Sequence, residues 1–299
     1  MISFKQLTLA TSMGALSLAL VACSDSEAPA SATTPANAPA AAKEAKPAVN
    51  PDAALVTSLP AHALQDDRSD YWEITSGTQA TYIYNGKMPE PDGTVAVIKT
   101  LNTGRYFRGT DELSERLDTY SKTRDEFVKK DLEKTITPLL QEQITKYGTH
   151  DFYKKTLTAH AIDMKPYDFE KEEFPLTSTL FSSMDEKLLS ARTPNKYKVS
   201  NSGHHYLEFY DARDYRFGFS NGEQLKSIKV KGDEARAIEA VRTAGGGDHL
   251  EMHVYGYVDK TIKGDVRATD PIRAVLLSVQ YIELVDKTKP NVVLYRHTL

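Results

Sequence analysis

The chain of 299 residues contains a single cysteine, Cys23. A chain with one thiol cannot close an internal disulfide bond, and it cannot supply several thiolates to a zinc ion. If Cys23 is itself modified, no cysteine nucleophile is left either. Any folded part must therefore be held together by its hydrophobic core, without a covalent crosslink.

The first 22 residues have the pattern of a secretory signal. Lys5 supplies one positive charge, and a mostly apolar stretch extends from Leu7 to Leu20. This stretch of ~14 residues is shorter than the ~20 that a membrane-spanning helix needs. We expect residues 1 to 22 to be a signal peptide that is removed. The alternative is an uncleaved anchor in which Cys23 is incidental.

The sequence Leu20-Val21-Ala22-Cys23 resembles the lipobox of bacterial lipoproteins. The resemblance covers the signal only, and it implies that Cys23 is acylated and becomes the first residue of the mature protein. Ser24 follows the cysteine, whereas an aspartate there resembles the inner-membrane retention signal of Gram-negative lipoproteins. The resemblance therefore implies an outer-membrane lipoprotein, facing either the periplasm or the cell surface. Asp25, one place later, leaves the inner membrane open.

Residues 23 to 60 are dominated by Ala, Pro, Ser and Thr with scattered charges. Such a composition buries too little apolar surface to offset the entropy lost on ordering. We expect a disordered tether that holds the folded part away from the membrane.

Residues 61 to 299 are long enough to bury a sizeable core as one large domain or two small ones. The chain is 40% hydrophobic and 26% charged, with a formal net charge of -4. A mildly acidic protein without clustered cations gives no reason to expect a nucleic-acid partner. The membrane, reached through the lipid, is the partner that the sequence does indicate.

Residues 61 to 148 are predicted to form a mainly helical part. Residues 61 to 93 show no clear period and are expected to be irregular, and the Val- and Ile-rich residues 94 to 101 predict a strand. From Thr110, a possible N-cap, apolar residues recur at helical spacing up to about Ile136. That apolar face includes Phe127 and Val128. Thr137-Pro138 then predicts a second helix that Gly148 closes, or a single long helix kinked at Pro138.

Residues 149 to 299 are predicted to be rich in strands and to share one domain with the helical part. The expected strands cover residues 152 to 164, 205 to 210, 215 to 219, 225 to 230, 250 to 258, 272 to 285 and 292 to 295. One short helix is expected at residues 235 to 242. Strands at short intervals favour an antiparallel sheet or sandwich, so the predicted fold class is α+β.

His249, Glu251 and His253 form the best candidate for a metal site. On a strand these residues share one face with neighbours ~7 Å apart, while Leu250 and Met252 face the other way. Imidazole and carboxylate are ligands that zinc accepts. The same alternation is typical of any half-buried strand, and three ligands along a flat strand cannot reach one ion without a bulge or a neighbour. One residue of the pair His204-His205 could supply that help.

Two further patterns have both a functional and a structural interpretation. The aromatic-rich residues 206 to 219 could form a sugar- or peptide-binding surface, although aromatics at alternate strand positions more often pack across strands. Gly245 to Gly247 could bind a phosphate, but such loops precede a helix, whereas a strand is predicted here. A helix stop or turn is the simpler interpretation. No serine lies in a Gly-x-Ser-x-Gly turn, so nothing marks a nucleophile.

The sequence therefore favours a non-enzymatic lipoprotein whose folded part binds a protein, a glycan or another envelope component. The alternative is a metal-dependent hydrolase of the cell envelope that uses zinc at His249, Glu251 and His253. The covalent lipid on Cys23 is the one attached group that the sequence predicts directly.

Overall fold

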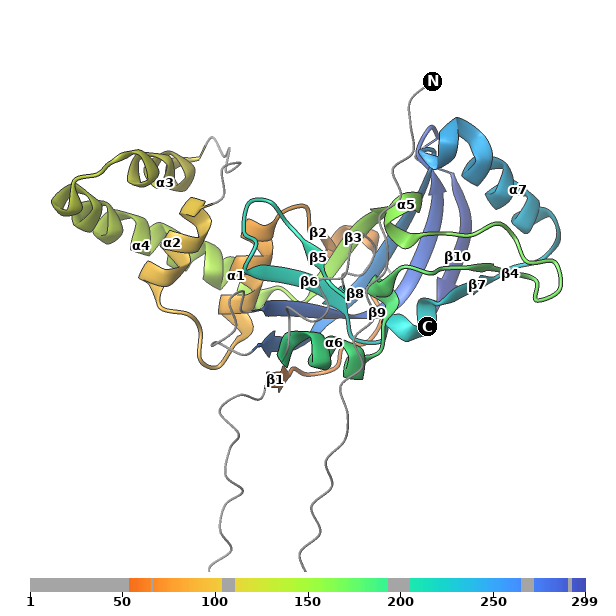
Figure 1. The fold of residues 1–299 in the computed structure, drawn as a ribbon, viewed down its shortest axis with the longest axis horizontal. Helices are drawn as coiled ribbons and strands as arrows, with labels where there is room; N and C mark the ends of the chain where they lie inside the picture. Colours follow the sequence, from red (N-terminus) through yellow and green to blue (C-terminus); the bar gives the residue numbers. More distant parts are fainter. Residues whose placement is uncertain (1–53, 66, 104–110, 193–204, 265–271, 290–291) are drawn as a thin grey trace, which may run out of the picture. The chain divides into compact units, whose positions relative to one another are not determined.

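Two long strands, β8 (Leu250–Lys263) and β9 (Arg273–Asp286), form the centre of the main sheet (Figure 1). In this computed structural model they pair antiparallel from Leu250 opposite Asp286 to Lys263 opposite Arg273. The structure describes residues 54 to 299 apart from residues 66, 104–110, 193–204, 265–271 and 290–291. Cys23, the predicted signal and the tether as far as residue 53 therefore lie outside the described residues.

Six further strands extend this sheet from both edges of the β8–β9 pair. On the β8 side lie β3 (Phe152–Thr158) and β1 (Leu55–Ser58), and β2 (Trp72–Glu73) pairs with β3. On the β9 side lie β6 (Tyr215–Phe219) and β10 (Val293–Thr298), and β5 (Leu207–Glu208) pairs with β6. The predicted α+β class is confirmed.

The predicted sheet is antiparallel, whereas the observed sheet is mixed. The pairs β2–β3 and β6–β9 are parallel, and the other pairs are antiparallel. Parallel neighbours need a long crossover connection. Four helices separate β2 from β3, and β7, a helix and β8 separate β6 from β9. The chain thus has the crossovers that two parallel pairs require.

A second sheet joins β4 (Glu173–Pro175) to β7 (Ser227–Lys229). The expected strand at residues 152 to 164 ends at Thr158, where α5 (Ala159–Ile162) begins. The expected strand at residues 205 to 210 is reduced to β5. The helix predicted at residues 235 to 242 is confirmed as α7 (Gly232–Thr243). The remaining short helices are η1 (Arg68–Asp70), η2 (Thr179–Phe181), α6 (Met184–Arg192), η4 (Gly222–Leu225) and η5 (Ala244–Gly247).

Two predictions in the helical part are wrong. Residues 61 to 93 contain α1 (Gly77–Lys87), which begins with a capping box between Ser76 and Gln79. The predicted strand at residues 94 to 101 is α2 (Thr94–Thr103). Val97, Ile98 and Leu101 are fully buried there, at helical spacing. A short run of Val and Ile fits either structure by itself, and packing decides between them.

The helix predicted from residue 110 to residue 136 is two helices, α3 (Glu112–Lys122) and α4 (Glu126–Thr149). Asp125 caps α4, because its carboxylate accepts hydrogen bonds from the backbone N–H groups of Phe127 and Val128. These two side chains, predicted on the apolar face, are 86% and 42% exposed. Because α4 begins anew after Asp125, Phe127 and Val128 do not continue the apolar face of α3.

α4 continues through Pro138. The residues before and after this proline therefore belong to one helix, and no second helix begins at Thr137. Gly148 does not close the helix, because α4 ends one residue later. A glycine is needed at position 148 because α1 packs closely against it. A Cβ atom at Gly148 would lie 2.7 Å from the Cα atom of Gly86 in α1. Gly148 therefore permits the two helix backbones to touch.

The tether predicted for residues 23 to 60 includes residues that are folded. β1 pairs with β8 from Leu55 opposite Lys263 to Ser58 opposite Lys260, and Ala54 is buried. Backbone hydrogen bonds to a strand edge do not require an apolar sequence, so composition alone misses this strand. All described residues belong to one compact unit, residues 49 to 299. Among them, no helix combines the length and the hydropathy needed to cross a membrane.

Candidate functional site

Glu251 and His253 lie on one face of β8, as the sequence predicts. The Nε2 atom of His253 is 3.7 Å from the Oε2 atom of Glu251, and both side chains are partly exposed. Leu250, Met252 and Val254 face the opposite way and are fully buried. The predicted strand register is therefore confirmed.

The predicted metal site is nevertheless not assembled in the part of the chain that the structure describes. No group of three His, Cys, Asp or Glu side chains is placed there to hold an ion. His253 instead has Lys154 as a neighbour, and burial together with this cation lowers the pKa of His253. Glu73 completes the cluster, since it accepts a hydrogen bond from Thr156 and pairs with Lys154 at 3.1 Å. His249 adds no third ligand, and His204 lies outside the described residues.

The three glycines at residues 245 to 247 end the η5 turn that follows α7, and β8 begins three residues after them. A phosphate loop would lead into a helix N-terminus instead. The simpler interpretation of these glycines, a turn at the end of a helix, is confirmed.

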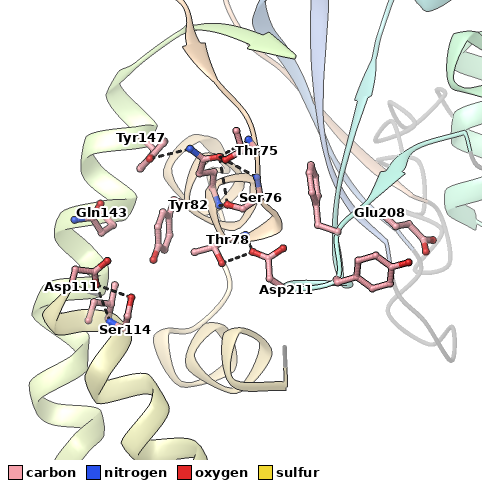
Figure 2. Close-up of a pocket in the computed structure, with 14 residues that line it drawn as sticks. Thr75, Ser76, Thr78, Tyr82, Asp111, Ser114, Gln143, Tyr147, Glu208 and Asp211 are labelled. Carbon is pink, nitrogen blue, oxygen red and sulfur yellow. Dashed lines mark hydrogen bonds between the residues drawn. The ribbon is translucent and has the colours of Figure 1, made fainter. Parts of the chain in front are cut away.

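A pocket of about 640 Å³ lies where α1, α3, α4 and the segment after β5 meet (Figure 2). Its size is within the range of pockets that bind small ligands. The lining side chains carry hydroxyls, amides, carboxylates and aromatic rings, and one of them is aliphatic. They belong to Thr75, Ser76, Thr78, Gln79, Tyr82, Asp111, Leu113, Ser114, Gln143, Tyr147, Glu208, Phe209, Tyr210 and Asp211.

Asp211 fastens the segment after β5 to the start of α1. Its Oδ1 atom accepts from the N–H group of Gly77 at 2.9 Å, and its Oδ2 atom accepts from the N–H group and the hydroxyl of Thr78 at 2.9 and 2.7 Å. A carboxylate at a helix N-terminus is stabilised by the free N–H groups and by the helix dipole. This wall of the pocket is therefore held in place before any ligand binds.

Asp111 is the N-cap of α3. Its Oδ1 atom accepts from the backbone N–H group and from the hydroxyl of Ser114, both at 2.9 Å. Its Oδ2 atom makes no hydrogen bond with another described residue. Asp111 thus has one oxygen fixed by the helix and a second oxygen available to the pocket.

Tyr82 extends from α1 between these two carboxylates (Figure 2). The side chain is only 5% exposed, and its hydroxyl makes no hydrogen bond with any described residue. Burial, Asp111, Tyr147 and Asp211 all raise the pKa of this hydroxyl, so it keeps its proton at neutral pH. The hydroxyl oxygen is not itself among the buried, unpaired side-chain atoms of the described residues, so it is accessible from the pocket that Tyr82 lines.

Tyr147 and Gln143 complete the wall that α4 forms. The ring of Tyr147 lies 5.6 Å from the ring of Tyr82. The Gln79 amide donates to the Tyr147 hydroxyl at 3.4 Å. The pocket therefore offers aromatic surface beside amide and hydroxyl groups, the combination that binds polar organic ligands.

The opposite wall comes from the aromatic-rich stretch for which the sequence allows ligand binding. Glu208, Phe209, Tyr210 and Asp211 line the pocket, and Tyr210 is largely exposed. Glu208 pairs with buried Arg216 at 3.1 Å. Four other aromatic residues of this stretch are buried: Tyr206, Tyr215, Phe217 and Phe219. Residues 208 to 211 are the part of it that lines the pocket.

Sequence reasoning did not single out the pocket-lining residues Tyr82, Asp111, Gln143 and Tyr147. They come from three separate helices, and no spacing along the chain relates them. No family model matches the chain, and neither the curated proteins nor the solved structures contain a match.

Proposed function

We propose that this protein is a non-enzymatic binding module of the cell envelope, and that the pocket beside α1 binds a polar envelope fragment such as a short glycan or peptide. The observation that carries the proposal is the pocket of about 640 Å³ with aromatic rings and hydrogen-bonding groups on facing walls. Aromatic faces give contact area, and the few polar groups give orientation.

Preorganised walls support this proposal. Asp211 is held by three hydrogen bonds and Asp111 by two, so binding does not have to order these side chains. A site that is ordered before binding loses less conformational entropy when the ligand arrives.

The location follows from the signal, as part of the same proposal. Acylated Cys23 anchors the protein in the outer membrane, because more than one acyl chain gives stable attachment. Cys23→Ser should abolish labelling by a radioactive fatty acid and leave unprocessed precursor, since the chain has no other thiol. Labelling that survives the substitution would show that the anchor lies elsewhere.

Binding is tested by titrating the purified full chain with solubilised peptidoglycan fragments and with outer-membrane oligosaccharides. We expect saturable binding of one class by calorimetry. Gln143→Ala should weaken that binding about tenfold, because the variant removes one amide from the wall and leaves α4 intact. Gln224→Ala is the control, since Gln224 lies in η4 and does not line the pocket. Saturable binding that Gln143→Ala leaves unchanged would contradict the proposal, as would no binding at all.

A further inference from the structure

The charged side chains that line the pocket are all carboxylates, as far as the described residues go: Asp111, Glu208 and Asp211. They differ in how completely the protein neutralises them. Glu208 is paired with Arg216, and both oxygens of Asp211 accept hydrogen bonds at the start of α1. Asp111 has one oxygen, Oδ2, that no described residue donates a hydrogen bond to.

Tyr82 and Asp111 line the same pocket. Of the charged groups around Tyr82, Asp111 has the largest effect on the pKa of the hydroxyl. The hydroxyl has no partner among the described residues although the side chain is almost wholly buried. Asp111 and Tyr82 thus line one pocket, and each has an oxygen atom that is not hydrogen-bonded to any described residue.

A protonated amine satisfies both groups at once. Its N–H bonds can donate to the Asp111 carboxylate and to the Tyr82 oxygen, and a hydrogen bond between charged groups is stronger than one between neutral groups. An anion would instead meet three carboxylates, and burying it there would be unfavourable. A neutral hydroxyl can reach the same atoms but leaves the charge of Asp111 uncompensated.

We propose that the pocket recognises its ligand through a positively charged amine bound between Asp111 and Tyr82. This inference rests on the proposed function and adds the chemical class of the ligand. The amine can belong to an amino sugar or to a lysine-like side chain of a peptide, and both present the same ammonium group.

Two pairs of probes separate charge from shape and distinguish these two sources. The first pair is the β-1,4-linked trimer of glucosamine and its N-acetylated form. The second pair is a lysine residue blocked at both backbone ends and its Nε-acetylated form. Titrations of the full chain are run at low salt and at about pH 6, where the amines are protonated. In at least one pair, the charged member should bind about tenfold tighter than the acetylated member.

Asp111→Asn should remove most of this preference. Asparagine is as good an N-cap as aspartate, so α3 keeps its hydrogen bonds to Ser114 and loses only the charge. Asp125→Asn is the matched control, because it makes the same change at the N-cap of α4, outside the pocket lining. It should leave the preference unchanged.

Tyr82→Phe tests the second contact. The hydroxyl makes no hydrogen bond with a described residue, so the variant should keep the melting temperature of the wild type. Its affinity for the charged probe should fall severalfold, and its affinity for the acetylated probe should change less.

Equal affinities within both pairs would overturn the inference, and so would a preference that survives Asp111→Asn. If an acetylated member binds as tightly as its charged partner and responds to Gln143→Ala, the proposed function stands without the amine. If no probe binds and no envelope fragment binds, both proposals fail.

Discussion

Two buried charges show different ways in which single residues are accommodated in this fold. Glu283 is 1% exposed and has Arg68 as its partner at 2.5 Å, with the Tyr255 hydroxyl at 3.3 Å. Lys187 is fully buried, and among the described residues no carboxylate forms an ion pair with it. Its ammonium donates instead to the carbonyl oxygens of Leu180 and Ser182 and to the Ser182 hydroxyl, at 3.1, 2.7 and 2.9 Å.

Burial lowers the pKa of Lys187 from 10.5 to about 7. The unfolded chain therefore holds this proton up to about pH 10.5, whereas the folded chain releases it near pH 7. Between these values the unfolded state carries more protons, so raising the pH favours folding, by up to ~1.4 kcal/mol per pH unit.

Lys187→Met should remove this contribution. In urea denaturation between pH 7 and pH 10, the free energy of unfolding of the wild type should rise relative to that of the variant. Lys122→Met, at an exposed ion pair on α3, is the control and should keep the wild-type slope. Parallel curves for the wild type and Lys187→Met would show that the lysine stays charged when buried.

At the scale of elements, the contact between α1 and α4 depends on two glycines. A Cβ atom at Gly86 would lie 2.5 Å from the Cα atom of Gly148, and the reverse distance is 2.7 Å. The helix backbones therefore touch without intervening side chains. Tyr82 and Gln143, which line the pocket, lie on these same two helices.

Gly148→Ala should destabilise the protein by ~1 to 3 kcal/mol, because the methyl group overpacks the contact. In an exposed helix the same change would stabilise by ~0.5 to 1 kcal/mol, so packing reverses the sign. Equilibrium denaturation measures the difference. Gly93→Ala is the control, since a Cβ atom there meets nothing within 4 Å, and it should cost less than ~1 kcal/mol. A variant at Gly148 more stable than the wild type would contradict the close contact.

At the scale of the whole molecule, the folded part begins earlier than the predicted residue 61. Ala54 is already buried, and β1 follows it directly. β1 adds four residues to the free edge of β8, beyond the end of β3. Most of its side chains are exposed, so backbone hydrogen bonds rather than apolar burial attach it.

Two deletions test this boundary. Removing residues 28 to 50 should leave the melting temperature within about one degree if these residues form the predicted tether, because a tether contributes no packing. Removing residues 28 to 58 should lower it by several degrees, because a loss of ~1 to 2 kcal/mol corresponds to ~2 to 8 °C at this size. Scanning calorimetry compares the two chains. Equal melting temperatures would show that β1 does not stabilise the sheet.

The sequence by itself determined the α+β class, the strand character of residues 250 to 258 and 272 to 285, and α7. Strict alternation from Leu250 to Val254 places apolar side chains on one face of a strand, and no helix places them so. The resemblance of residues 20 to 23 to a lipobox is likewise a property of sequence alone, and the lipid anchor stays a prediction.

Only the tertiary structure decided α2, the place of Gly148 and the pocket. Val97, Ile98 and Leu101 suit either a strand or a helix, and contacts with distant segments select the helix. The pocket joins Tyr82, Asp111, Gln143 and Asp211, which lie up to 129 positions apart in the chain. Local patterns record which face of an element is apolar, whereas the meeting of separate elements depends on packing between residues far apart in sequence.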